Sequence, residues 1–339
     1  MFRAGIVGYG KIGKLRAKAI KQIKNTTLVA IYDIANPKLI DGKVKVCKSF
    51  NELLEQKLDI IFVCTFNDAL ADFTIKSLKK DIHVFCEKPP AKNTKELSEV
   101  MRVEKKYGKV LKYGFNHRYH YSVIEAKKIV DSGVMGKLLW MRGVYGKAGS
   151  IDYDKNWRNF RKLSGGGILI DQGIHILDLM IYFSNSNFHK VNSLVTNSFW
   201  KIEAEDNAFV IMQNTEKVTA TLHSSATQWR HKFLLELCFE EGYLNLDGIL
   251  SNTRSYAPEK LIIGRREFED ITHAMGKPKE TTTWFEHDDS WIYEIEDFID
   301  AIDGKKKLQN GTSEDAYNVL KLVEDIYDQS GFYDAKLKY

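Results

Sequence analysis

The segment that most constrains the fold of this chain is a glycine-rich turn close to the first residue. An apolar strand, Arg3–Val7, runs into Gly8-Tyr9-Gly10-Lys11-Ile12-Gly13, and a basic stretch then predicts a helix from Lys14 to about Ile23. Gly8 permits a tight turn, Gly10 lets the backbone approach a pyrophosphate, and Gly13 lets helix and strand pack closely. We therefore expect a βαβ unit that binds a dinucleotide at the positive end of its first helix.

A second apolar run, Leu28–Tyr32, ends at Asp33. The distance from the last glycine is about twenty residues, the spacing at which an acidic side chain meets the adenosine ribose hydroxyls. Asp33 would repel a 2′-phosphate, and Ile34 and Ala35 follow it in place of an arginine. The pattern favours NAD, with NADP as the weaker alternative. An ordinary βαβ unit with a glycine turn is the simpler interpretation, but strand, glycines, helix and acid occur in the order that the motif requires.

Strand and helix patterns alternate over the first third of the chain, which predicts an α/β fold with a parallel, doubly wound sheet. Ligands of such sheets bind beyond the carboxyl ends of the strands. Polar side chains at the predicted strand ends are therefore candidates for the site, namely Thr65, Asn67, Glu87, Lys88 and Asn116. Asn93 and Glu96 predict the N-cap of a helix that extends to about Tyr107.

The pattern changes after about residue 120. A helix is expected over Tyr121–Asp131, and two amphipathic helices are expected near Ser290–Asp303 and Ser313–Ser330. The β-type runs between them predict a large, mostly antiparallel sheet; they are Leu138–Tyr145, Val191–Phe199, Asn207–Gln213, Val218–Ser225, Phe233–Phe239 and Tyr243–Leu246. We expect two domains, a dinucleotide-binding domain over 1–118 and a substrate-binding and oligomerisation domain over 119–339.

Composition narrows the possible partners. With 28% charged and 44% hydrophobic residues, the 339-residue chain is typical of globular proteins. The net charge of +5 is spread along the chain, so we expect no nucleic-acid partner. We also expect no membrane partner, because no apolar run approaches a membrane span, and no signal peptide. The four cysteines are far apart in the sequence, which favours the reducing cytoplasm, and no side chains have the spacing of metal ligands.

The internal segment with the clearest chemical content starts at Gly165-Gly166-Gly167. A helix is expected to follow, and it would place Asp171, His175 and Asp178 on one face. An aspartate beside a histidine can fix its tautomer and stabilise its charged form, as acid–base catalysis requires. The alternative is a helix that turns a polar face to solvent. The triple glycine and the dinucleotide motif favour the catalytic interpretation.

Lys88 and two basic, aromatic stretches are further candidates. Lys88 at the end of a parallel strand would lie beside a nicotinamide, although a solvated loop lysine is the simpler interpretation. The stretches Arg142–Lys162 and Gln228–Lys232 combine arginine and lysine with aromatic residues. Aromatic rings stack on sugar faces and arginine binds phosphates or carboxylates, which suggests an anionic substrate. Solvated loops with ordinary charges explain these stretches equally well.

These motifs together resemble the Gfo/Idh/MocA family of oxidoreductases, and the resemblance covers almost the whole chain. It rests on the glycine motif, Asp33, Thr65-Phe66-Asn67, Glu87-Lys88-Pro89, Asn116-His117-Arg118, Trp157-Arg158 and the block from Gly165 to Asp178. The chain departs from the family at Phe66, where proline is frequent, and at Leu70, where histidine is frequent. Those departures affect the cofactor loop and leave Lys88, Asp171 and His175 intact.

The resemblance implies a Rossmann domain, a second α/β domain with a large open sheet, and a homodimer or homotetramer assembled through that sheet. It implies NAD(P)-dependent oxidation of a sugar or cyclitol hydroxyl, or the reverse reduction. The basic, aromatic stretches add a sugar acid or a nucleotide sugar to the expected substrates. The catalytic residues would be Lys88, Asp171 and His175, and the substrate would also contact Arg118, Tyr145, Trp157 and Arg158. The cofactor would contact Gly8, Tyr9, Gly10, Lys11, Ile12, Gly13, Asp33, Thr65, Phe66, Asn67, Glu87, Lys88 and Asn116.

In the expected mechanism, His175 takes the hydroxyl proton while Lys88 stabilises the developing alkoxide. Asp171 positions His175, and Asp178 has a structural role. The sequence alone also allows Lys88 and His175 to exchange these two roles. Two rival functions are a glycosidase that recycles its NAD and a non-catalytic dinucleotide-binding protein. The first would release a hydrolysed sugar without net NADH, and the second would not depend on Lys88 or His175.

Overall fold

The computed structural model describes residues 1–37 and 42–334, which form two compact units. The first unit comprises Met1–Asn116, Lys162–Gly165 and Asp289–Leu320. The second comprises His117–Arg161, Gly166–Asp288 and the described residues from Lys321 onward. The expected domains, 1–118 and 119–339, are each continuous, whereas each compact unit collects separate segments of the chain.

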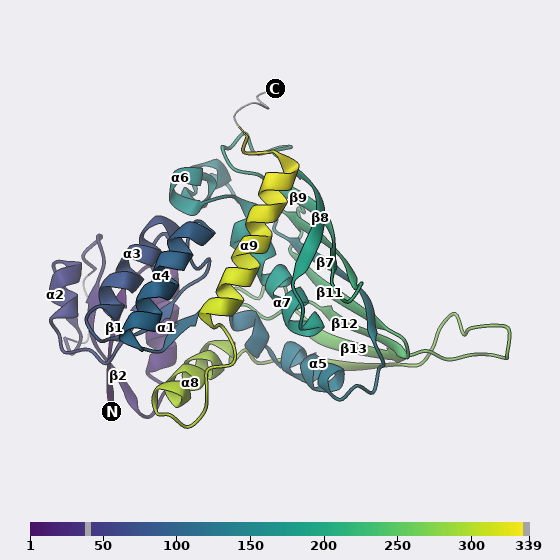
Figure 1. Ribbon diagram of the computed structural model, residues 1–339, viewed down its shortest axis with the longest axis horizontal. Coiled ribbons are helices and arrows are strands. Elements are labelled where there is room, and N and C mark those ends of the chain that lie inside the picture. Colours follow the sequence, from purple (N-terminus) through teal and green to yellow (C-terminus); the bar gives the residue numbers. More distant parts are fainter. Residues whose placement is uncertain (38–41, 335–339) are drawn as a thin grey trace. The chain divides into compact units, whose positions relative to one another are not determined.

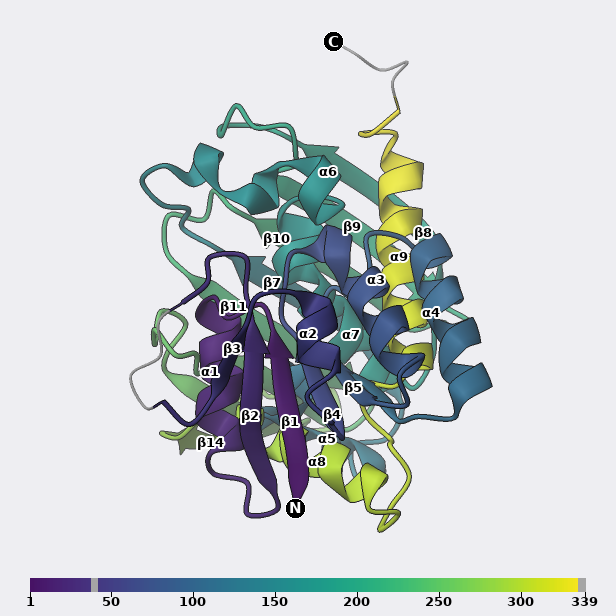
Figure 2. The same ribbon diagram turned by 90° about the vertical axis from the view of Figure 1, so that its left-hand side faces the viewer.

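Within the described ranges, six parallel strands form the sheet of the first unit, in the order β3-β2-β1-β4-β5-β6 (Figure 2). This order confirms the doubly wound parallel sheet. The strands are β1 (Phe2–Val7), β2 (Thr26–Tyr32), β3 (Lys45–Cys47), β4 (Ile60–Val63), β5 (His83–Cys86) and β6 (Leu111–Tyr113). The short edge strand β3 was not expected from the sequence.

Helices and an aromatic core complete the first unit. The helices are α1 (Lys11–Ile20), α2 (Phe50–Leu54), α3 (Asn67–Leu78), α4 (Thr94–Tyr107) and α8 (Ser290–Ile302). The Asn93 side chain accepts a hydrogen bond from the N–H of Glu96 at 2.9 Å, which confirms the predicted N-cap of α4. Phe298 of α8 packs edge-on against Phe62 and Phe85 of the sheet. Each such fully buried side chain contributes roughly 1.5–3 kcal/mol to folding.

The second unit is built on a larger sheet with the strand order β14-β13-β12-β11-β7-β10-β9-β8 among the residues described. All neighbours are antiparallel except β7 and β10, which confirms a mostly antiparallel sheet. The strands are β7 (Leu138–Gly146), β8 (Phe188–Thr196), β9 (Asn207–Asn214), β10 (Thr219–Ser225), β11 (Lys232–Phe239), β12 (Gly242–Asp247), β13 (Glu259–Arg265) and β14 (Glu280–Phe285). Burial alternates along β9 to β12, so each of these strands turns one side to the core.

Helices α5 (Tyr121–Asp131) and α7 (Ile174–Ser184) cover one face of this sheet (Figure 1). Between β7 and α7 the described chain forms four short helical segments, namely η2 (Tyr153–Lys155), η3 (Trp157–Asn159), α6 (Arg161–Ser164) and η4 (Leu169–Gly173). The 3₁₀ helix η1 (Asn116–Tyr119) begins at the last residue of the first segment of the first unit, and α9 (Ser313–Ser330) begins in the first unit and ends in the second. The opposite face of the sheet carries exposed apolar side chains, among them Trp140, Phe209 and Ile211.

The helical run Arg161–Ser184 is long and apolar enough to cross a membrane by length and composition alone. However, 78% of its most apolar window is buried inside the structure. Core helices pass the same test, so the run is weak support for a membrane span.

Candidate functional site

The glycine turn of the first unit has the geometry that its three glycines predict. Gly8 has φ +85°, and a Cβ there would lie 2.4 Å from the carbonyl oxygen of Cys64. A Cβ on Gly13 would lie 2.1 Å from the carbonyl oxygen of Gly8, so helix α1 packs against the turn in a way that only glycine allows. A Cβ on Gly10 would meet no atom within 4 Å. Gly10 therefore borders open space, in which a phosphate could approach the backbone.

Helix α1 begins at Lys11, three residues earlier than expected, and Gly10 is its N-cap. No side chain caps this end, and the first turn carries no acidic residue. Helix geometry leaves the first backbone N–H groups without acceptors inside the helix. With the helix dipole, this end of α1 suits the pyrophosphate of a dinucleotide.

Asp33 lies beside the turn, at the end of β2. Its Oδ2 atom accepts a hydrogen bond from the N–H of Tyr9 at 2.5 Å, and its Oδ1 atom accepts one from the N–H of Ala35 at 2.7 Å. Two backbone donors thus fix the carboxylate next to the glycine turn. This is the place that ribose recognition requires.

The other cofactor candidates follow neighbouring strands at the same edge of the sheet. Thr65, Phe66 and Asn67 follow β4, Glu87 and Lys88 follow β5, and Asn116 comes soon after β6. Phe66 is the N-cap of α3, and the Asn67 side chain donates to the carbonyl of Ser164 at 2.8 Å. The Asn116 side chain donates to Ser290 Oγ at 3.3 Å. Parallel strands thus bring the candidates to one edge, as the sequence predicts.

The Glu87 side chain points into a buried ionic cluster. Arg16 Nε of α1 lies 2.6 Å from Glu87 Oε1, and another nitrogen of Arg16 lies 2.7 Å from Glu294 Oε2. The guanidinium is fully buried between the rings of Phe85 and Trp291, 4.2 and 4.4 Å from their centroids. Burial, with the nearby charge of Glu87, raises the pKa of Glu294 to about 7, although Arg16 and Lys112 oppose the shift. The cluster fixes the strand end from which Lys88 extends.

In the second unit, the triple glycine leads into a π-helical turn, η4 (Leu169–Gly173), before α7 begins. A Cβ on Gly166 would lie 2.2 Å from Tyr327 Oη, and one on Gly167 would lie 2.2 Å from the carbonyl oxygen of Glu205. The glycines therefore allow close packing at the entry of the helix. The predicted helix is present, but it is π-wound over the residues that include Asp171. Such turns occur frequently at functional sites.

A buried carboxylate, Glu205, holds the start of this turn. It accepts hydrogen bonds from the N–H of Gly167 at 2.8 Å, the N–H of Leu169 at 2.9 Å and Tyr327 Oη at 2.8 Å. A further hydrogen bond comes from Tyr333 Oη. Burial raises the pKa of Glu205 in spite of these donors. Glu205 is an N-terminal cap from a distant part of the chain.

Asp171 is surrounded by donors. Arg158 Nε lies 3.0 Å from Oδ1, Gln172 Nε2 donates to Oδ2 at 2.9 Å, and Lys147 Nζ is 4.0 Å from Oδ2. The Arg158 guanidinium also lies over the Trp157 ring, 4.5 Å from its centroid. Two cations thus stabilise the ionised form of Asp171. The ion pair with Asp171 holds Arg158 in place, and the Trp157 ring lies under the guanidinium of Arg158.

His175 follows one turn later and is buried. Its ring stacks on His117, with the centroids 3.8 Å apart and the planes at 16°. Tyr145 Oη lies 3.2 Å from Nε2 of His117. Burial raises the pKa of Tyr145 well above its ordinary value, so its phenol keeps its proton. Tyr145 is thus linked to His175 through His117, which contacts the Tyr145 hydroxyl and stacks on the His175 ring.

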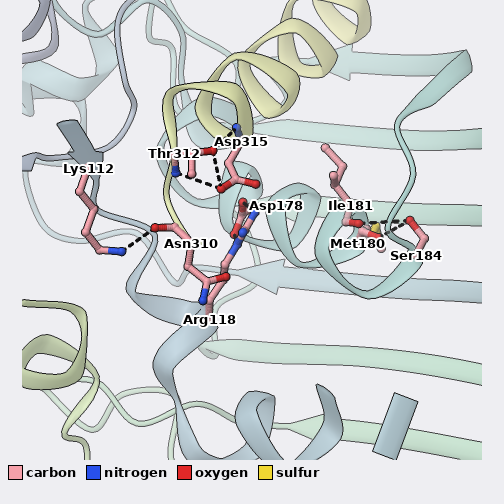
Figure 3. Close-up of polar contacts among 9 residues, drawn as sticks. All are labelled: Lys112, Arg118, Asp178, Met180, Ile181, Ser184, Asn310, Thr312 and Asp315. Carbon is pink, nitrogen blue, oxygen red and sulfur yellow. Dashed lines mark hydrogen bonds and ion pairs between the residues drawn. The ribbon is translucent and has the colours of Figure 1, made fainter. Parts of the chain in front are cut away.

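Arg118 and Asp178 form a buried ion pair between η1 and α7 (Figure 3). Arg118 Nε and a terminal nitrogen lie 2.9 and 2.7 Å from the two Asp178 oxygens, a bidentate arrangement. Tyr182 covers the guanidinium at 4.7 Å. This geometry matches the structural role expected for Asp178. The substrate contact predicted for Arg118 stays a prediction.

Sequence reasoning did not identify Arg16, Glu205 or His117 as contributors to the site. Arg16 and Glu205 act on residues far away in the chain, and neither belongs to a local motif. His117 stands within Asn116-His117-Arg118, but its stacking partner His175 is distant in the sequence, so no local pattern indicates the contact. Within the described part of the chain, no group of three or more His, Cys, Asp or Glu side chains is arranged to hold a metal ion.

Comparison with known protein families gives two matches that follow one another along the chain. Residues 2–115 match the model described as an oxidoreductase family with an NAD-binding Rossmann fold. Residues 123–245 match the GFO/IDH/MocA C-terminal domain. Together the two matches include the glycine turn, Lys88, Asp171 and His175.

Known proteins resemble the chain over different lengths. It is 29% identical to a myo-inositol 2-dehydrogenase of Thermotoga maritima over 221 residues, which are 62% of this chain and 64% of the relative. It is 32% identical to a D-glucoside 3-dehydrogenase of Escherichia coli over 216 residues, 59% of this chain and 58% of the relative. The alignments thus span less than two thirds of these relatives. A levoglucosan dehydrogenase solved with NADH and levoglucosan shares the fold, with TM-score 0.85, 18% identity and 97% coverage of each chain.

Proposed function

We propose, since the chain belongs to the Gfo/Idh/MocA family of oxidoreductases, that it is an NAD-dependent dehydrogenase or reductase of a small sugar-like substrate. The observation that carries the proposal is the π-turn that presents Asp171 one helical turn before a buried histidine, His175. A carboxylate that is paired with cations and a histidine close to it are suited to acid–base work on a hydroxyl. The two relatives are named as dehydrogenases of myo-inositol and of a D-glucoside, which is the same class of reaction.

The cofactor proposed is NAD. The open space at Gly10, the uncapped start of α1 and the position of Asp33 beside the turn fit a dinucleotide. Asp33 supports NAD over NADP, because a carboxylate repels a 2′-phosphate. Bound NAD would supply hydride transfer to or from the carbinol carbon.

The chain supplies the proton chemistry. During oxidation, Nδ1 or Nε2 of His175 accepts the hydroxyl proton, and the Lys88 ammonium donates a hydrogen bond to the same oxygen as negative charge develops. The two roles are interchangeable in this proposal. Asp171 orients the substrate and the histidine while Arg158 and Lys147 keep it ionised.

The substrate proposed is a sugar, sugar acid, nucleotide sugar or cyclitol. Lys147 and Arg158 together outweigh Asp171 by one positive charge, which supports an anionic group on the substrate. We propose that Tyr145, Trp157 and Arg158 contact this substrate. A cytoplasmic location is also proposed, because the four cysteines are free thiols in the described structure.

The test of the proposal is NADH formation by the purified chain with NAD and a panel of compounds. The panel contains inositols, glucosides, free sugars, sugar phosphates, sugar acids and nucleotide sugars, and each keto product is offered with NADH in reverse. We expect turnover of at least one compound, with NAD preferred to NADP. His175→Ala and Lys88→Ala should each lower kcat/KM by about 10²–10⁴-fold while NAD binding is retained. Full turnover by either variant, or hydrolysis without net NADH, would contradict the mechanism.

We propose further that the chain forms a homodimer or homotetramer through the uncovered face of the large sheet. Exposed apolar side chains on this face include Trp140, Phe209, Ile211 and Trp284. An apolar patch of this kind marks an interaction surface. Light scattering should show that Phe209→Lys with Ile211→Lys dissociates the oligomer. Val134→Lys, at an equally exposed position outside the sheet, is the control and should not.

A further inference from the structure

Three aromatic side chains of the second unit, Phe199, Trp200 and Trp229, form an exposed cluster that we call the aromatic corner. The ring centroid of Phe199 lies 5.1 Å from that of Trp200 and 4.9 Å from that of Trp229, and both pairs of rings are nearly perpendicular. Phe199 is 55% exposed and Trp229 is 59% exposed, although both are large and apolar. A group of apolar rings turned toward water marks an interaction surface.

The backbone holds Trp229 in a strained conformation. Its φ is +53°, in the left-handed region, and the N–H of Arg230 donates to the carbonyl oxygen of Gln228 at 2.6 Å across it. A bulky side chain rarely occupies the centre of such a three-residue turn, where glycine or asparagine fits at lower cost. Strained residues concentrate at ligand sites, so the exposed indole points to binding and not to packing.

The strained turn is attached to the candidate site through Lys147. The N–H of Gln228 donates to the carbonyl oxygen of Lys147 at 3.2 Å, and Trp229 comes directly after this contact. The ammonium of Lys147 lies 4.0 Å from Asp171 Oδ2. A path of two residues therefore joins the exposed indole to the carboxylate of the candidate site.

The inner side of the aromatic corner leads to the same π-turn. The Trp200 ring packs on Tyr153, with the centroids 4.7 Å apart, and its indole N–H donates to the carbonyl oxygen of Ala226 at 2.8 Å. Tyr153 and Ala226 in turn pack with Ile168, the residue that precedes the π-turn. The corner is therefore built on the same small core as the turn that presents Asp171, and its outer rings reach water.

We propose that the aromatic corner is a subsite for a second ring, the one to which the reacting sugar is joined. The reacting sugar lies at Asp171, and the next ring of a glycoside or nucleotide sugar covers the exposed indole of Trp229. The apolar face of a sugar ring, or the face of a base, removes aromatic surface from water when it stacks there. The preferred substrate is then a two-ring compound and not a free sugar or a cyclitol. This inference rests on the proposed function, because Asp171 defines where the reacting ring lies.

The decisive variant is Trp229→Asn, because asparagine tolerates the left-handed backbone and lacks the indole. Calorimetry measures binding to the full chain in the presence of NADH, with which no hydroxyl is oxidised. Glucose, galactose and mannose are each offered as the methyl glycoside, which has one ring, and as the phenyl glycoside, a disaccharide and the nucleoside diphosphate sugar. We expect at least one two-ring compound to bind about tenfold more tightly than its methyl glycoside, and Trp229→Asn to abolish the preference. The compound that shows it identifies the second ring as a sugar, an aryl group or a base.

Phe268→Asn is the matched control, because Phe268 is also 55% exposed and lies between β13 and β14. It should leave the preference in place. Thermal unfolding checks the fold of Trp229→Asn, and we expect a nearly unchanged midpoint, since the lost ring is mostly exposed and the strain at its backbone is relieved. If Trp229→Asn does not fold, Phe199→Leu removes the perpendicular ring and should weaken the same preference.

Equal affinities for one-ring and two-ring compounds, or a preference that survives Trp229→Asn, would overturn the proposal. Dissociation of an oligomer by Trp229→Asn in light scattering, with sugar affinities unchanged, would also overturn it and assign the corner to a contact between copies of the chain. A two-ring compound that binds through Trp229 but is never oxidised with NAD would support the subsite and contradict the proposed function alone. Turnover confined to one-ring compounds would support the proposed function and contradict the subsite.

Discussion

In the first unit, Glu87 and Glu294 share the single guanidinium of Arg16, whereas in the second unit Glu205 accepts hydrogen bonds from neutral groups. Both arrangements are buried, and each supports a segment that carries candidate catalytic residues. In the first, burial raises the pKa of Glu294 to about 7, although Arg16 and Lys112 favour its ionised form. In the second, backbone N–H groups and tyrosine hydroxyls satisfy one carboxylate. Burial raises the pKa of Glu294 and of Glu205 alike, but the first arrangement joins ionised side chains, whereas the second uses neutral donors to define a turn.

Removal of Arg16 should have the largest effect. Arg16→Met leaves two buried carboxylates without their counter-charge, which we expect to cost about 3–5 kcal/mol of unfolding free energy. Urea unfolding in the absence of NAD measures this loss. Arg102→Met is the control, because Arg102 is exposed and pairs with Glu99 on the surface of α4. Equal losses in the two variants would show that the buried cluster has no special role.

Glu294→Gln tests the pH dependence. The folded-state pKa of Glu294, about 7, lies above its ordinary value of 4.5, so the folded chain binds the proton more tightly than the unfolded chain. Stability should therefore decrease by roughly 2–3 kcal/mol as pH rises from about 4.5 to 7, and Glu294→Gln removes this decrease. The stability of the variant relative to the unchanged chain should be greater at pH 8 than at pH 5. Parallel curves from urea unfolding would contradict the assignment.

Glu205→Gln should cost less. An amide places an NH₂ group where the carboxylate accepted a backbone N–H, so one buried donor loses its acceptor, at about 1–3 kcal/mol. Thermal unfolding measures the loss, and kcat should fall because the turn that carries Asp171 is no longer fixed. Tyr333→Phe removes a single hydroxyl donor and should have a smaller effect. If Glu205→Gln is fully stable and active, the capping role is wrong.

Gly10→Ala should change stability least, by less than about 1 kcal/mol, because its methyl group enters open space. The same methyl would occupy the phosphate approach, so we expect NAD binding to weaken at least tenfold, by about 1.4 kcal/mol or more. Isothermal calorimetry measures this binding. Gly13→Ala is the contrasting variant, since its Cβ would lie 2.1 Å from the Gly8 carbonyl and should destabilise the turn itself. Unchanged NAD affinity in Gly10→Ala would place the cofactor elsewhere.

Local pattern was sufficient for much of the fold. The N-cap at Asn93, helix α5 over Tyr121–Asp131 and helix α9 over Ser313–Ser330 lie where they were predicted. Strands β13 and β14 and helices α2 and α3 were not expected. Strand β14 is mostly exposed and α2 has five residues, so neither has a strong hydrophobic period.

The sequence by itself determined the glycine turn, Asp33 and the order of the strand-end residues. Each of these depends on backbone geometry within a few residues, or on the rule that parallel strands end at one edge. Only the tertiary structure decided that Glu87 meets Arg16, that Glu205 caps the turn before Asp171, and that His117 stacks on His175. Those contacts join residues that are 38 to 71 positions apart along the chain. Side-chain partners at such separations are set by packing, which no local period in the sequence encodes.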